Sequence, residues 1–293
     1  VGVQVQSAGN TISTNKIVGN TEAGVVIVGA SATSNTISAN SIYSNGELGI
    51  DLANDGVTVN DTLDTDVGAN TLQNYPTVIY VITTATLTQV EASLSSTPNS
   101  TFTVEVFRSA GTDGTGYAEG EFYLGSTTAT TDAAGYTQFT YTTTAVLTSE
   151  EVLTLTARDA AGNTSEFSEV VAAFPPHVVV NTNDNGLGSL RNAIEIANAA
   201  SGTTATVISF AIPGAGVQRI TLSTTLPEIT RPVIIDGLTQ PGSTCGTLSI
   251  AIDGTRLSTG AGLRLTDGSA GTTVRGIPIQ RFPDAAIRIR SAN

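Results

Sequence analysis

Cysteine, lysine, methionine and tryptophan are almost absent from this sequence. Its 293 residues include one cysteine, one lysine (Lys16), no methionine and no tryptophan. With one cysteine the chain can form no internal disulfide, and we expect Cys245 to be a small, half-buried residue. The formal net charge is −13 at pH 7, which argues against nucleic acid as a partner.

Long apolar runs and helix-forming segments are also scarce. No run approaches the roughly 20 residues of a membrane-spanning helix, so we expect no membrane insertion. The chain begins at Val1 without a methionine, and we interpret it as a mature or excised piece of a longer precursor. Thr, Ser, Gly, Asn and Val dominate, which is typical of β-rich proteins.

One pattern occurs twice in the first 52 residues. The segment Asn10–Asn20 recurs as Asn35–Asn45, and seven of its residues are repeated in place at an offset of 25. Strand and turn signals alternate without an amphipathic helix, so the repeat predicts stacked turns, here called rungs, of a parallel β-helix. An antiparallel sandwich with repetitive turns is the alternative.

Short strand triplets between the copies predict which side chains point inward. In the first triplet, Val3 and Val5 should line the interior while Gln4 faces outward. Stacked turns also place Asn above Asn, so that side-chain amides can bond from rung to rung. In the later triplets we expect Val25, Ile27, Ile50 and Leu52 inside, and Val26 and Asp51 outside.

Residues 53–76 are acidic and rich in turn formers. Crowded carboxylates repel one another unless they are hydrated or bridged by a cation, and Ca²⁺ prefers such oxygen-rich loops. The spacing does not match the EF-hand loop, so a solvated acidic loop is the alternative. The candidate calcium ligands are Asp55, Asp61, Asp64 and Asp66.

Residues 77–174 change character and predict an immunoglobulin-like β-sandwich of about seven short strands. Among the acidic residues of this part, Glu119, Glu121, Asp159 and Glu166 could bind a cation, but we expect them at the surface. The core should contain Phe102, Val104, Val106, Phe139, Leu153 and Leu155. The expected strands include Leu87–Leu94, Thr101–Arg108, Phe122–Thr128, Tyr136–Thr142, Val152–Arg158 and Glu166–Ala172.

The last part of the chain, residues 175–293, predicts a second piece of β-helix. Ser189 can cap an amphipathic helix over Leu190–Ala200, which we expect to cover one end of the coil. The segments Gly262–Leu265 and Ala286–Ile289 lie 24 residues apart. Each is a small residue followed by a strand triplet, as in the first rungs. Strands are expected at Val207–Ile212, Arg219–Leu222, Val233–Ile235, Leu248–Ile252, Leu263–Leu265, Val274–Ile279 and Ile287–Ile289.

The predicted fold is therefore all-β: a right-handed parallel β-helix split between the two ends of the chain, a central sandwich and one short capping helix. Residues 1–76 hold the last rungs and the acidic loop. Residues 77–174 form the sandwich. Residues 175–293 hold the capping helix and the first rungs.

Several motifs resemble secreted bacterial proteins with right-handed parallel β-helix repeats and bacterial immunoglobulin-like modules. Gly186–Ile194 is similar to the segment that opens their β-helices, often named after a CSLREA motif, and Leu226–Thr230 with Ile235–Gly242 resembles the segment that follows. Leu72–Pro76 resembles the passage into the sandwich, and Ala161–Ser168 its last hairpin. The resemblance implies an extracellular or cell-surface structural or adhesive role, without catalytic residues to carry over.

The chain departs from the order of that family, because the β-helix begins in the C-terminal part and ends in the N-terminal part. Open β-helix ends expose strand edges that invite pairing with another chain. Stacking the end of one copy on the start of the next would propagate into a fibre. Covalently joined copies with residues missing between them, and closure within one molecule, are the alternatives. The contact would involve Val3, Val5, Ile287 and Ile289.

We therefore expect a structural subunit of an extracellular or cell-surface filament, which polymerises head to tail with itself. A cell-surface adhesin that binds glycan or a receptor is the alternative. A polysaccharide lyase or glycosidase would need convergent carboxylates or a basic residue beside calcium. We expect no enzyme and no cofactor other than calcium, because the possible catalytic residues fall on different rungs: Asp51, Asp55, Arg264 and Arg288.

Overall fold

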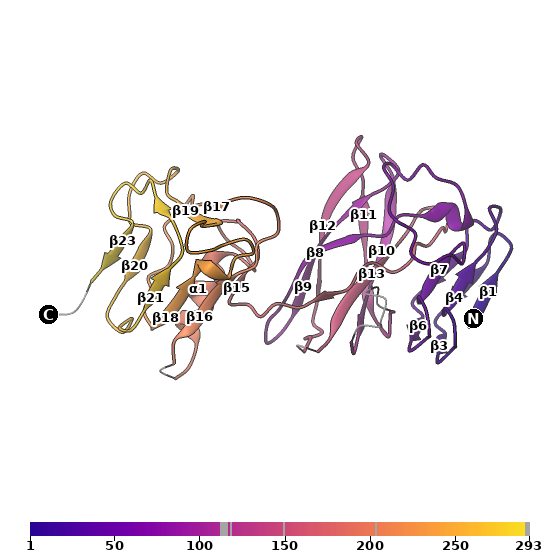
Figure 1. Ribbon diagram of the computed structural model, residues 1–293, viewed down its shortest axis with the longest axis horizontal. Coiled ribbons are helices and arrows are strands. Elements are labelled where there is room, and N and C mark those ends of the chain that lie inside the picture. The colour runs from indigo at the N-terminus through magenta and orange to yellow at the C-terminus, as the bar shows by residue number, and fades with distance from the viewer. Residues whose placement is uncertain (112–116, 118, 149, 203, 291–293) are drawn as a thin grey trace. The chain divides into compact units, whose positions relative to one another are not determined.

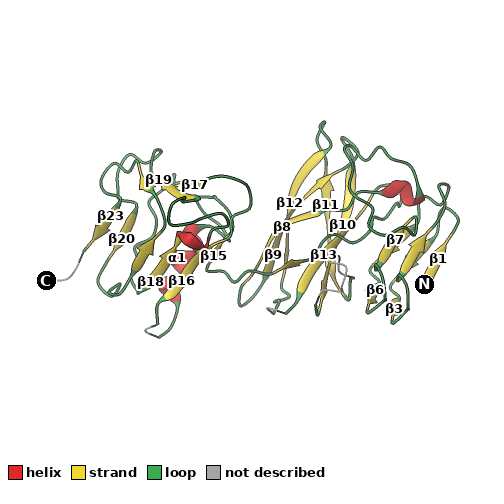
Figure 2. Ribbon diagram, in the orientation of Figure 1, coloured by secondary structure: helices red, strands yellow, loops and turns green. Residues whose placement is uncertain are grey.

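The computed structural model describes residues 1–111, 117, 119–148, 150–202 and 204–290. The chain divides into two compact units, unit 1 (Val1–Phe174) and unit 2 (Pro175–Asn293) (Figure 1). Strands dominate both units (Figure 2). Each unit contains a parallel β-solenoid, and unit 1 also contains an antiparallel sandwich. The predicted all-β class and the parallel coil are confirmed.

Three parallel sheets build the solenoid of unit 1. The 25-residue repeat is their register, because Thr11 pairs with Thr36 and Lys16 with Ser41. The sheets are β1 (Val3–Val5), β4 (Val25–Ile27) and β7 (Ile50–Leu52); β2 (Thr11–Ser13) and β5 (Thr36–Ser38); and β3 (Lys16–Val18) and β6 (Ser41–Tyr43). One edge strand of each sheet, β1, β2 or β3, comes from the start of the chain.

The core of this solenoid contains the predicted inward side chains. Val5, Val25, Ile27, Ile50 and Leu52 share one buried cluster, and Val3 packs against it. The alternation of strand side chains thus places every second residue inside. The expectation that Val26 and Asp51 face outward was wrong. Other parts of the chain cover both residues, which are 0% and 4% exposed.

Asp51 is buried because the chain folds back over β7. The backbone N–H groups of Asp55 and Gly56 donate to the Asp51 carboxylate at 3.2 and 3.3 Å. The loop then continues to a short 3₁₀ helix, η1 (Ala69–Leu72). The acidic loop therefore closes over the last rung instead of extending into solvent.

Two antiparallel sheets pack face to face in the rest of unit 1. One has the order β12, β9, β8 and the other β11, β10, β13, β14. Residues of both sheets share a buried cluster, for example Val81 and Val90 with Val104 and Leu155. The strands are β8 (Thr77–Thr83), β9 (Thr88–Ser95), β10 (Thr101–Ser109), β11 (Phe122–Thr130), β12 (Tyr136–Thr143), β13 (Val152–Arg158) and β14 (Val171–Ala172).

Three expectations for this sandwich need correction. β8 was not predicted as a strand, although its sequence is rich in β-branched residues. The predicted strand Glu166–Ala172 shrinks to the two residues of β14, because Glu166 and its neighbours turn toward the solenoid. Phe139 is only partly buried, whereas the other five predicted core residues are buried.

Unit 2 repeats the three-sheet arrangement. Two complete rungs, β18–β20 and β21–β23, follow β15–β17, and the sheets have the orders β15-β16-β18-β21, β17-β19-β22 and β20-β23. The predicted strand Val274–Ile279 is two strands, because Gly276 turns the chain with φ 69°. The strands are β15 (Val178–Val179), β16 (Thr206–Phe210), β17 (Gln218–Thr221), β18 (Val233–Asp236), β19 (Ile250–Asp253), β20 (Leu263–Leu265), β21 (Thr273–Arg275), β22 (Ile279–Gln280) and β23 (Ile287–Ile289), with 3₁₀ helix η2 (Gly237–Thr239).

The helix α1 (Leu190–Ala199) packs on this solenoid. Ser189 caps it as predicted, since its side chain accepts a hydrogen bond from the backbone N–H of Asn192 at 3.2 Å. Leu190 and Ile194 are fully buried and join the core of the rungs together with Phe210. The predicted amphipathic helix is confirmed, one residue shorter at its end.

Candidate functional site: solenoid ends and acidic loop

Asparagine side chains connect successive rungs of unit 1 at their turns. The backbone N–H and the side-chain amide of Asn10 both donate to Asn35 Oδ1, at 3.0 and 2.9 Å. Asn15 donates in the same way to Asn40. The bonds between asparagines run in one direction, from each rung to the Oδ1 of the next, so the predicted asparagine stacking is confirmed; Asn40 also donates back to the Ile12 carbonyl.

The column of Asn20 and Asn45 ends at a buried carboxylate of the sandwich, whereas the column of Asn10 and Asn35 ends at Asn70. Asn20 donates to Asn45, and Asn45 in turn donates through its side-chain amide to Glu119 at 2.6 Å. Glu105 accepts hydrogen bonds from Ser38 and from the N–H of Ala39 at 2.5 and 2.8 Å. The N–H groups of Ala39 and Asn45 would donate to a further rung if one followed. They donate instead to acidic side chains of the sandwich.

Glu166 provides a third cap of this kind. It accepts the N–H groups of Leu52 and Thr58 at 2.8 and 2.9 Å and is 2% exposed. Burial raises its pKa to about 7, partly offset by these hydrogen bonds. The expectation that Glu119 and Glu166 lie at the surface was wrong, because both carboxylates are buried between the solenoid and the sandwich.

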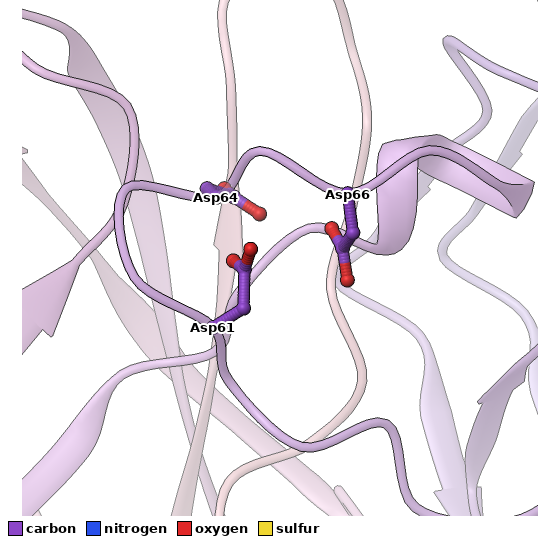
Figure 3. A group of neighbouring side chains, drawn as sticks. All are labelled: Asp61, Asp64 and Asp66. Atoms are coloured by element: carbon purple, nitrogen blue, oxygen red, sulfur yellow. The ribbon is translucent and has the colours of Figure 1, made fainter.

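Three of the four predicted calcium ligands lie together in the acidic loop. Carboxylate oxygens of Asp61, Asp64 and Asp66 lie within 4.8 Å of one another, and Figure 3 shows the three side chains turned toward a common space. Asp55 is not part of this cluster, because it belongs to the turn that covers Asp51. The four-residue prediction thus reduces to a three-residue cluster.

Hydrogen bonds from nearby residues of the same chain hold Asp61 and Asp64 in place. Asp64 accepts from Gln73 at 2.6 Å, from Asn74 at 3.2 Å and from the hydroxyl of Ser96. Asp61 Oδ2 accepts from Thr65 at 3.1 Å. Asp64 is therefore fixed against Ser96 of the sandwich, and Asp61 is fixed within the loop.

The cluster has the chemistry of a hard-cation site. Asp61 Oδ1 and Asp66 Oδ1 are both buried without a hydrogen-bond partner among the described residues, which is costly for a carboxylate. Burial also raises the pKa of Asp64 to about 6 and that of Asp66 above its usual value. Calcium favours several carboxylate oxygens with water completing its shell, and the orphaned oxygens fit that need.

The predicted contact residues lie on edge strands of the two solenoids. β1 ends the order β1-β4-β7 and β23 ends the sheet β20-β23. Ile287 and Ile289 are 39% and 73% exposed, whereas Val5 is buried. A cavity of about 450 Å³ adjoins β23, between Leu265, Ile289 and the turn before β21. Apolar surface is therefore exposed at the last rung of unit 2.

Backbone groups at these edges alternate in direction. Val3 donates its N–H to Gly24 at 2.9 Å, and Val5 accepts from Val28 at 2.8 Å. The backbone of Gln4, between them, consequently faces away from β4. By the same alternation, the N–H and C=O groups of Ile287 and Ile289 face away from β20. Each edge thus offers donors and acceptors in the pattern of parallel pairing.

Three of the four residues considered for catalysis have their side chains in other contacts. Asp51 is bonded to backbone N–H groups, as described above. Arg264 donates to the Leu226 carbonyl at 2.7 Å and pairs with Glu228, while Arg288 pairs with Asp284. Cys245, expected to be half-buried, is exposed. No helix within the described residues is long and apolar enough to cross a membrane.

The chain matches no family model and no curated protein with which it was compared. Its fold and its edges define it as a protein with two parallel β-solenoid units and one antiparallel sandwich.

Proposed function

We propose that this chain is a structural subunit of an extracellular or cell-surface filament. The last rung of unit 2 in one copy stacks on the first rung of unit 1 in the next copy. Val3, Val5, Ile287 and Ile289 lie at this junction. The sandwich acts as an immunoglobulin-like spacer between successive solenoid segments, as the resemblance to secreted β-helix proteins implies.

The observation that carries this proposal is the matched pair of strand edges. The groups of Gln4 that face away from β4 and those of the last rung that face away from its own solenoid alternate in the same parallel pattern. Edge strands of this kind are templates for strand addition between chains. Because the two edges belong to different surfaces, the contact is head to tail and propagates.

The two edges also differ from the capped end of the unit 1 solenoid. There, Glu105, Glu119 and Glu166 occupy the backbone donors of the last rung. Asn15 and Asn20, in the first rung, have Oδ1 atoms that accept no hydrogen bond from the described residues. One end of this solenoid is thus closed by the sandwich, and the other retains acceptors for a further rung.

Sedimentation velocity of the purified chain and of Gln4→Pro tests the proposal. Proline removes the outward N–H of Gln4 without removing a hydrogen bond to β4, and prolines are tolerated on edge strands. We expect the parent to form large species and Gln4→Pro to stay monomeric with an unchanged unfolding curve. A parent that stays monomeric, or a folded variant that assembles equally well, would contradict the proposal.

A further inference from the structure

The last rung of unit 2 has the same layout as the rungs of unit 1. The first residues of β21 and β23 lie 14 positions apart, as do those of β2 and β4 and those of β5 and β7. A left-handed residue follows the first strand of each rung: Thr14, Ala39 and Gly276, with φ of 57°, 50° and 69°. The two solenoids therefore share a cross-section, and a rung of one can stack on a rung of the other.

The second turn of the rung matches as well. Gly19 and Arg281, with φ of 72° and 58°, follow β3 and β22. The next residues are Asn20 and Phe282. Since the Asn20 N–H donates to Asn45 Oδ1 at 3.1 Å, the Oδ1 of Asn20 is placed to accept the corresponding N–H of Phe282 from a rung on its other side.

A glycine precedes most triplets of this type because the next rung lies too close for a side chain. A Cβ on Gly2 would lie 2.6 Å from the Gly24 carbonyl oxygen, and one on Gly24 would lie 2.7 Å from that of Gly49. A Cβ on Gly262 would lie 2.6 Å from the Ala286 carbonyl oxygen. Ala286 is the exception in this series, and β23, which follows it, is the last strand among the described residues of unit 2.

Ala286 therefore obstructs direct stacking of β1 on β23. In the geometry of the other rungs, its methyl group would meet the Gly2 carbonyl oxygen as closely as the distances above. That register would also leave β2 and β3 one strand layer, about 4.8 Å, too far from β21 and β22. Two of the three sheets would then remain unpaired at the junction.

A different register joins all three sheets. If β1 takes the position of β23 on β20, then β2 lies on β21 and β3 lies on β22. Gly2 then takes the place of Ala286 above Gly262. Since Gly2 has no side chain, the methyl group of Ala286 no longer stands in the way of the next rung. The opposite exchange, with β23 in the position of β1 on β4, is blocked because Ala286 would meet the Gly24 carbonyl oxygen.

We propose that assembly proceeds by strand exchange, in which β1 of one copy displaces β23 from β20 of the next copy. This inference rests on the head-to-tail filament of the proposed function but revises its junction: β1 pairs with β20, and Ile287 and Ile289 leave the contact. β23 is held by three residues on one neighbouring strand, and its apolar side chains are largely exposed. It acts as a temporary cover of the β20 edge, and its release is the step that opens the chain to a second copy.

Two engineered disulfides in a Cys245→Ser background test this exchange. Arg264→Cys with Arg288→Cys locks β23 to β20, because these residues are register partners. Gln4→Cys with Val26→Cys locks β1 to β4 in the same way. Neighbouring parallel strands have the Cα separation that a disulfide requires. The reduced form of each variant is its own control for the substitutions.

We expect the oxidised β20–β23 lock to abolish assembly in sedimentation velocity and reduction to restore it, while the β1–β4 lock assembles in both states. Trypsin should also cleave after Arg288 faster in the polymer than in the monomer. If the oxidised β20–β23 lock assembles like its reduced form, strand exchange is wrong and the proposed filament stands. If the Cys245→Ser parent itself never assembles, the proposed function fails and the exchange fails with it.

Discussion

Asn45 and Glu119 form a hydrogen bond between two parts of unit 1 that lie 74 residues apart. The Asn45 amide donates to Glu119 at 2.6 Å, and its backbone N–H donates to the same carboxylate at 3.1–3.2 Å. Asn45 Oδ1 receives both donors of Asn20. One asparagine thus links a repeat column of the solenoid to a buried acid of the sandwich.

Asn45→Ala should therefore be more harmful than the same change at the exposed end of the column. The variant leaves a buried carboxylate and two donors of Asn20 short of partners, which should lower the free energy of unfolding by about 2–4 kcal/mol. Asn20→Ala removes only the last members of the column and should cost roughly 0.5–1 kcal/mol. Chemical denaturation measures both, and equal losses would contradict the capping role of Glu119.

Glu166 should give unit 1 a characteristic pH dependence. Burial raises its pKa from the ordinary 4.5 to about 7 in the folded chain, so the folded state binds the proton more tightly. Its contribution to stability is then greatest below pH 4.5, falls as the pH rises to 7 and is constant above. Glu166→Gln should remove this titration, which is worth about 3 kcal/mol.

The measurement is the free energy of unfolding of parent and variant between pH 4.5 and 7.5. The free energy of unfolding of the variant minus that of the parent should increase by that amount as the pH rises over this range. The other titrating groups are common to both chains and cancel in the difference. A constant difference for Glu166→Gln would show that the carboxylate is not held as described.

Calcium should stabilise unit 1 through the three-aspartate cluster. At a calcium concentration about 1,000 times Kd, binding to the folded state adds about 4 kcal/mol. We expect the Tm in calcium to exceed the Tm in EDTA for the parent. Asp61→Asn and Asp66→Asn should lose this difference, since each neutralises a carboxylate with an orphaned oxygen.

Asp55→Asn is the matched control, because Asp55 lies in the same loop but outside the cluster. It should retain the calcium effect seen in the parent. Equal Tm values with and without calcium in the parent would contradict a cation site. Loss of the effect in Asp55→Asn would instead place the site elsewhere in the loop.

The solenoid could be predicted from the sequence because its pattern is local and repeated. Asn10 and Asn35 stand at equivalent turns, so a one-dimensional offset already defines the pairing register. The positions of Val25 and Ile50 in the core follow from alternation within a triplet. Because the pattern repeats, a single sequence is enough to predict which residues contact each other in neighbouring rungs.

The capping acids could not be predicted in this way. Glu119 and Glu166 stand among glycine, serine and asparagine residues that indicate surface turns, and their partners lie 74 and 114 residues away. Their burial depends on how the sandwich packs against the last rung. Asp55 shows the same limit, since composition groups it with Asp61 whereas the fold-back over Asp51 separates the two.

Electron microscopy of the purified chain tests the central claim most directly. The account predicts fibres with one axial repeat per copy, which disappear in the folded Gln4→Pro variant. Discrete particles of a single chain, at concentrations where the protein is folded and pure, would contradict it.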